Sequence, residues 1–198
     1  MEQPTALLER LQRVRNSLAA LDQPGIFGAR AHRGLLGPTL TESEVAGFER
    51  RHGIVLPAEY RAFVTGVGHG GPGRYGGAGP FYGLLPLDRW DEALVEDTHD
   101  RVLTTPFPVA PGREYGADWL SEVGLSDDDD REWFPGAIAL AHLGCGDMAV
   151  LVVTGAGRGR VAYTSWASQA PAFSPDPDFL AWYQRWLDAA GRGDSHWF

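Results

Sequence analysis

The spacing of the hydrophobic residues constrains the fold of this chain more than any other feature. In residues 5–21 and 41–67, large apolar side chains recur at helical spacing, with polar residues between them. From residue 136 to residue 165 they form short continuous runs bounded by glycines, which is typical of strands. Helical spacing returns after residue 178. This order predicts a single α+β domain, in which helices pack on one side of an antiparallel sheet.

The segment 41–67 carries the clearest local signals. Thr41 and Glu44 are spaced as a capping box, in which each side chain accepts a hydrogen bond from the other residue's backbone N–H. The helix that they begin is expected to end near Gly53, because glycine readily adopts the left-handed conformation of a C-terminal cap. Pro57 then suits the first position of the next helix, where no N–H is needed. Two short helices with a tight connection are therefore predicted.

The remaining elements follow from the same reasoning. An amphipathic helix is predicted at 5–21 and a strongly apolar one from Asp178 to Gly191. Loops are predicted at 22–38 and at 68–80, where seven glycines indicate a mobile or tightly turned segment. Strands are predicted at 81–87, 137–143, 148–153 and 159–165, a short helix at 88–97, and loops with one short helix at 100–135.

The net charge of −9 is concentrated in one stretch of the chain. Residues 88–132 hold fourteen acidic residues against four arginines, and Asp127, Asp128, Asp129 and Asp130 form an unbroken run. Such a surface repels nucleic acid and attracts basic proteins. Aromatic residues among these carboxylates could anchor a partner, or they could simply cover the sheet. A solvated acidic loop is the alternative to a docking surface.

A cytoplasmic location is predicted, with no contact to a membrane. The N-terminal residues carry charges where a signal peptide needs an apolar run, and no apolar stretch is long enough to span a bilayer. The single cysteine, Cys145, cannot form an internal disulfide. No cofactor and no metal site is predicted, since no histidine pair has ligand spacing and the glycine-rich loop has no lysine for a phosphate loop.

One set of residues could in principle perform catalysis. His142, Cys145 and Asp147 offer a base, a nucleophile and an orienting acid within six positions. The glycines on both sides of Cys145 suit a turn between strands, however, and a structural role is the interpretation we favour. The chain is therefore predicted not to be an enzyme.

Three segments together resemble the SUKH superfamily. They are residues 40–63, which include GIVLPAEYRAF, residues 144–161, which begin GCGD, and residues 179–182, FLAW. Two features depart from that pattern: the Gly66–Gly70 segment replaces the usual Asn-Gly pair, and residues 88–134 look like a long acidic insertion. The domain is placed at 39–190, after an N-terminal helix and loop at 1–38 and before a tail at 191–198.

The resemblance implies a noncatalytic protein-binding module, and the use of Arg without any Lys suggests a bacterial source. The bacterial members of the superfamily look mostly like immunity proteins that neutralise a cognate toxin by binding it. Its fungal members, regulators of cell-wall assembly, suggest the alternative of a cytoplasmic scaffold without a toxin partner. A basic toxin domain is the expected partner. The residues expected to contact it are Arg74, Tyr75, Trp90, Trp119, Asp127, Asp128, Asp129, Asp130 and Trp133.

Overall fold

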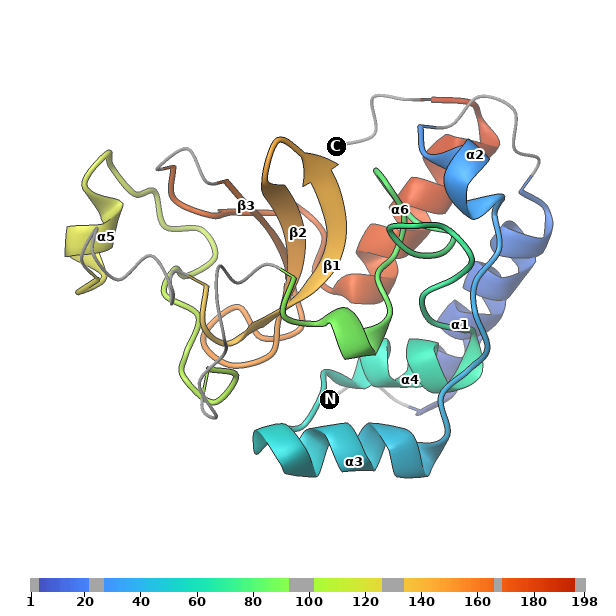
Figure 1. Ribbon diagram of the computed structural model, residues 1–198, viewed down its shortest axis with the longest axis horizontal. Helices are drawn as coiled ribbons and strands as arrows, with labels where there is room; N and C mark the ends of the chain where they lie inside the picture. Colours follow the sequence, from blue (N-terminus) through green and yellow to red (C-terminus); the bar gives the residue numbers. More distant parts are fainter. Residues whose placement is uncertain (1–3, 22–26, 93–101, 126–133, 166–168, 195–198) are drawn as a thin grey trace.

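A computed structural model describes residues 4–21, 27–92, 102–125, 134–165 and 169–194 (Figure 1). Within these ranges the chain forms helices on one side of a four-stranded sheet and an irregular layer on the other, an α+β fold as predicted. The elements are α1 (Pro4–Ala19), α2 (Ala29–His32), α3 (Glu42–His52), α4 (Ala58–Gly66), the 3-10 helix η1 (Leu87–Arg89), α5 (Trp119–Glu122), β1 (Ala137–Gly144), β2 (Asp147–Val152), β3 (Val161–Thr164), β4 (Ala172–Phe173) and α6 (Phe179–Gly191). Helix α2 and strand β4 were not predicted.

The predicted capping box at the start of α3 is confirmed. The backbone N–H of Glu44 donates to Thr41 Oγ1 at 3.2 Å, and that of Thr41 donates to Glu44 Oε2 at 2.7 Å. Gly53 caps the other end with φ of 66°. Pro57 is the N-cap of α4 rather than its first residue, a shift of one position that leaves its missing N–H without cost.

The sheet is antiparallel throughout, with the strand order β1-β2-β3-β4. In β1, β2 and β3, residues of the same strand enter two different hydrophobic clusters: Ile138 and Leu140 face the helices, whereas Ala137 and Ala139 face the opposite side. A strand that is covered on both faces is apolar at every position. This explains why the strands appear in the sequence as continuous apolar runs rather than as an alternating pattern.

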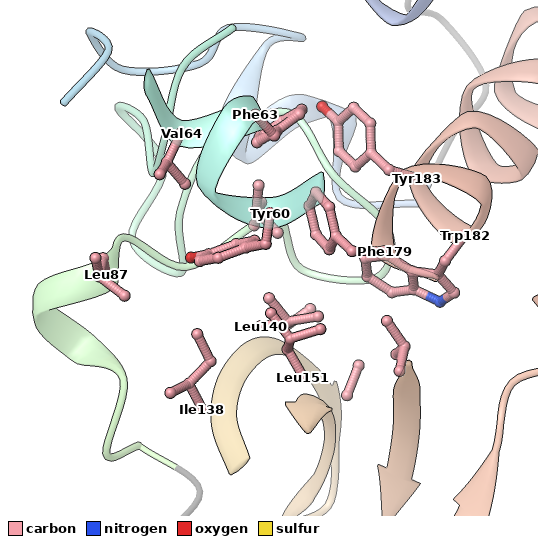
Figure 2. Packing of buried hydrophobic residues seen from close by; sticks show 14 of the residues in the cluster. Tyr60, Phe63, Val64, Leu87, Ile138, Leu140, Leu151, Phe179, Trp182 and Tyr183 are labelled. Carbon is pink, nitrogen blue, oxygen red and sulfur yellow. The ribbon is translucent and has the colours of Figure 1, made fainter. Parts of the chain in front are cut away.

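Aromatic rings of α4 and α6 fill the space above the helical face of the sheet (Figure 2). Phe179 lies at the centre, with its ring centroid 4.9 Å from that of Tyr60 and 5.1 Å from that of Phe63, both edge to face. The Tyr183 ring follows at 4.8 Å from Phe63, and its hydroxyl donates to the Ala78 carbonyl at 2.6 Å. The closing helix is thus joined both to α4 and to the glycine-rich loop.

The opposite face of the sheet is covered by the segment that precedes it in the sequence. Trp119, Leu120, Phe107 and Phe134 pack there against the second set of strand residues. Helix α5 stands at this side of the molecule, away from the other helices (Figure 1). The predicted short helix within 100–135 is confirmed, and the described part of the acidic stretch forms a second covering layer.

The predicted strand at 81–87 is not a strand, although it lies along β1. The backbone N–H groups of Tyr82 and Leu85 donate to the carbonyls of His142 (3.3 Å) and Leu140 (2.8 Å). Further along the edge, Ala139 N–H donates to the Trp90 carbonyl at 2.8 Å. The prediction failed because these bonds are too widely spaced to form a ladder. The predicted helix at 88–97 is seen only as η1, and residues 93–97 lie outside the described ranges.

Helix α1 packs along α6, and two of its arginines bind neighbouring elements. Arg10 Nη2 lies 2.5 Å from Asp178 Oδ1, the N-cap residue of α6, and Arg15 donates to the Gly66 carbonyl at 2.6 and 3.0 Å. Among the described residues, no helix has the length and hydropathy that a bilayer crossing requires.

Candidate protein-binding surface

Arg74 and Tyr75 occupy the tip of a tight turn in the glycine-rich loop. The backbones of Gly73 and Gly76 exchange two hydrogen bonds of 3.0 Å, which leaves Arg74 and Tyr75 as the two central residues. Behind the turn the loop is closely packed, since a Cβ on Gly77 would lie 1.7 Å from the Gly70 carbonyl oxygen. Of the two predicted possibilities, mobile or tightly turned, the structure shows the second. A rigid base therefore presents both side chains.

Four rings from three separate segments form a row beside this turn. The Tyr75 ring lies 5.3 Å from Tyr82 and 5.2 Å from His142, and Tyr82 lies 5.0 Å from Phe27. Every contact is edge to face, the arrangement that aromatic quadrupoles favour. Phe27 is 58% exposed, and the other three are half-buried. We call Phe27, Tyr75, Tyr82 and His142 the aromatic row.

Charged groups border the aromatic row on the side of η1. The Arg74 guanidinium lies 5.2 Å from the centroid of the Tyr75 ring, and Arg89 Nη1 donates to the Arg74 carbonyl at 2.9 Å. Glu92 bridges Arg89 and His142, with Oε2 at 2.5 Å from His142 Nε2. Burial alone would raise the pKa of Glu92, but the hydrogen bonds from Arg89 and His142 outweigh it, so the pKa is lowered. The carboxylate consequently stays ionised and holds the histidine ring in place.

Two predicted contact residues are largely buried. Trp119 is 1% exposed in the second cluster, which favours the alternative that the aromatic residues of this stretch cover the sheet. Trp90 is 8% exposed and packs edge to face against His52 at 4.8 Å. Its remaining surface lines a groove of about 390 Å³ between α3 and η1, together with Leu40, Phe48 and Leu87. Neither indole presents a broad face to a partner in this structure.

The other predicted contact residues lie outside the described ranges. These are Asp127, Asp128, Asp129, Asp130 and Trp133. Their role in binding stays a prediction.

The candidate catalytic residues are arranged as a turn rather than as a relay. Cys145 has φ of 54° between Gly144 (105°) and Gly146 (89°), so three consecutive residues take left-handed conformations at the β1–β2 connection. The His142 ring contacts Tyr75 and Glu92. This geometry supports the structural interpretation of Cys145. The described residues contain no cluster of three or more His, Cys, Asp or Glu side chains that could bind a metal ion.

Sequence reasoning missed Phe27, Tyr82, Glu92 and the part that His142 plays in the surface. Phe27 and Tyr82 are 55 positions apart, so no local spacing connects them. One signal was available, because Tyr75 and Tyr82 flank residues 76–81, which include three glycines. Aromatic residues at both ends of a tight loop are brought close whenever the loop folds back.

The chain was compared with known proteins. The model of the SMI1 / KNR4 family (SUKH-1) matches residues 39–185. No curated protein matches the chain, and no solved structure does. The matched range contains most of the aromatic row and leaves out α1, α2 and Phe27.

Proposed function

Because the chain belongs to the SMI1 / KNR4 family (SUKH-1), we propose that it is a noncatalytic binding module that acts as an immunity protein. In this role it binds a cognate toxin and blocks the toxin's active site sterically. The partner surface is the aromatic row with Arg74, and the partner is a basic protein domain.

The observation that carries this proposal is the placement of the aromatic row on a closely packed base, with Phe27 58% exposed and Tyr75 half-buried at the tip of the turn. Large aromatic residues supply most of the energy at protein interfaces, because they bury much surface and lose few rotamers. Tyr75 is held on both sides by Tyr82 and His142, and its loop is closely packed from behind. A partner that binds there orders little of the chain, which keeps the entropic cost of binding low.

Charge supports the choice of a basic partner. Asp88 and Asp91 are exposed on the segment that borders the row, at the start of the acidic stretch 88–132. Arg74 is the exposed cation at the tip of the turn, and it lies against the Tyr75 ring. Carboxylates along this stretch attract a basic domain and speed encounter, while the aromatic contacts slow its release.

The proposal is tested by capture of partners from the native host, followed by affinity measurements on variants. A basic toxin encoded beside this chain should be captured at a one-to-one ratio. Tyr75→Ala should then weaken binding at least about tenfold, the usual loss at an interface anchor. The control is Val55→Ala, which truncates a side chain that is 66% exposed beyond the row and should leave affinity unchanged.

Two results would count against the proposal. Capture of host proteins alone, with no toxin gene nearby, would favour the scaffold or regulatory alternative. Equal affinities of Tyr75→Ala and Val55→Ala for a captured toxin would place its binding surface elsewhere.

A further inference from the structure

Helices α1 and α6 enclose a cationic pocket between them. Its volume is about 360 Å³, within the range of ligand clefts. Four arginines reach it, from both helices and from the residue after α6, over a small apolar floor that includes Val14 and Leu180. In a chain with net charge −9, such a concentration of guanidinium groups in one concavity is distinctive. The arginines are Arg10, Arg13, Arg185 and Arg192.

The four arginines divide into two kinds. Arg10 pairs with Asp178, and Arg185 binds Asp176 with both Nε and Nη2, at 2.8 to 3.1 Å. Arg13 and Arg192 are exposed, and among the described residues their guanidinium groups form no ion pair. Two guanidinium groups are therefore available to an incoming anion, while the other two fix the walls.

Gln184 of α6 also lines the pocket and binds Ser17 of α1. Its Nε2 donates to Ser17 Oγ at 2.9 Å and to Asp188 Oδ1 at 2.7 Å, which fixes the orientation of the amide because a carboxylate only accepts. The Oε1 atom is then buried, with no hydrogen-bond partner among the described residues. Because this atom has almost no accessible surface, Gln184 acts as part of the wall, and the groups open to a ligand are the free guanidinium groups and the Asp188 carboxylate.

We propose that this pocket binds an acidic peptide segment of a partner protein. The carboxylate of an Asp or Glu side chain pairs with Arg13 and Arg192, and a backbone N–H of the same segment donates to the Asp188 carboxylate, which lines the pocket and is exposed. A peptide supplies both groups at once, whereas inorganic phosphate supplies mainly acceptors. Asp188 also repels a doubly charged anion more than a single carboxylate.

This site is independent of the aromatic row. Arg10, Arg13 and Val14 precede the family match at residues 39–185, and Arg192 follows it. Peptide binding here can succeed or fail whatever happens to the toxin-binding proposal.

The test is a titration of the isotope-labelled protein with the blocked peptide acetyl-Gly-Asp-Glu-Asp-Gly-amide, followed by NMR. The Gln184 side-chain amide and the Nε–H signals of Arg13 and Arg192 should shift and saturate. The double variant Arg13→Gln/Arg192→Gln should weaken binding about tenfold or more, since two charge-assisted hydrogen bonds are lost. The charge-matched control is Arg30→Gln/Arg50→Gln, which removes two exposed arginines outside the pocket and should bind as the unaltered protein does.

Three outcomes would overturn the inference. The first is the absence of shifts at Gln184, and the second is equal binding of the peptide by the two double variants. The third is inorganic phosphate producing the same shifts at equal or higher affinity, which would define a simple anion site. Unfolding curves establish that each variant is folded, and Arg13→Gln alone serves where the double variant is unstable.

Discussion

At the scale of single residues, two histidines are held in surroundings that disfavour their charged form. His32 is fully buried, with Nδ1 accepting from Gly34 N–H at 3.0 Å, and His52 lies between the rings of Phe48 and Trp90. Burial lowers the pKa of His32. Burial also lowers the pKa of His52. The nearby charge of Arg51 lowers this pKa further, and the charge of Asp91 opposes the shift. The Nε2 atom of each ring is buried without a partner among the described residues.

These histidines make stability depend on pH. At a pH below about 6.5, the histidine pKa in the unfolded chain, the unfolded chain binds protons at these two residues that the folded chain does not bind. The free energy of unfolding therefore falls with acidification. Most carboxylates remain ionised between about pH 7.5 and pH 5.5, and the loss in that window belongs to the histidines. Urea unfolding across these pH values should show the decline.

His52→Phe tests this assignment, because a phenyl ring fits between Phe48 and Trp90 and carries no unpaired nitrogen. The variant should be at least as stable as the unaltered protein near neutral pH, and its stability should decline less on acidification. His32→Asn retains an acceptor for Gly34 N–H and should likewise flatten the pH dependence. An unchanged slope in both variants would contradict the assignment.

At the scale of elements, the same substitution has opposite effects in α3 and in the glycine-rich loop. A Cβ on Gly77 would overlap the backbone of Gly70, whereas one on Gly47 in α3 would have only an arginine side chain at 4.0 Å. Gly77→Ala should therefore destabilise the protein by about 3 kcal/mol through overpacking, and displace Arg74 and Tyr75. Gly47→Ala should stabilise it by roughly 0.5–1 kcal/mol, because alanine favours the helix.

Chemical denaturation of the two variants, with toxin binding as a second readout, measures this contrast. Gly47→Ala should bind as tightly as the unaltered protein, whereas Gly77→Ala should bind more weakly under conditions where it is folded. A Gly77→Ala variant of normal stability would show that the loop can move apart to admit a methyl group.

Local elements could be predicted from the sequence wherever adjacent residues determine them. The capping box at Thr41, the cap at Gly53 and the strands around the Gly155 turn are such cases, because each depends on residues a few positions apart. The segment 81–87 was mistaken for a strand because its composition is strand-like, while its hydrogen bonds depend on where β1 lies. The aromatic row escaped prediction for the same reason, since only the fold brings Phe27 to Tyr82.

At the scale of the whole molecule, the acidic stretch 88–132 both covers one face of the sheet and holds the chain's excess of negative charge. Its described aromatic residues, such as Trp119, close the second core. Under the proposed function, its carboxylates act through long-range electrostatics, which affect the rate of encounter with a partner more than the strength of the final contact. Recognition and attraction can therefore reside in different parts of the chain.

Replacement of Asp127, Asp128, Asp129 and Asp130 with asparagine tests the electrostatic task. Association with a captured basic toxin should slow by roughly tenfold at low ionic strength, while dissociation changes little. Stopped-flow measurements at about 50 mM and about 500 mM salt should show the two rates converging at the higher concentration, where charges are screened. Association that is insensitive to salt would remove the electrostatic part of the proposal.

The hydrogen bonds along the outer edge of β1 have a consequence for how partners can change over evolution. That edge is already occupied by the backbone of 82–90, so a partner cannot join the sheet there by adding a strand of its own. Recognition at this edge therefore depends on side chains, and Arg74 and Tyr75 project from a turn whose frame is made by closely packed glycines. Substitutions at these two positions alter what the surface accepts while the frame stays folded. Under the proposed function, exchange of the two residues at this tip would let the protein bind an altered toxin without a change in the rest of the fold.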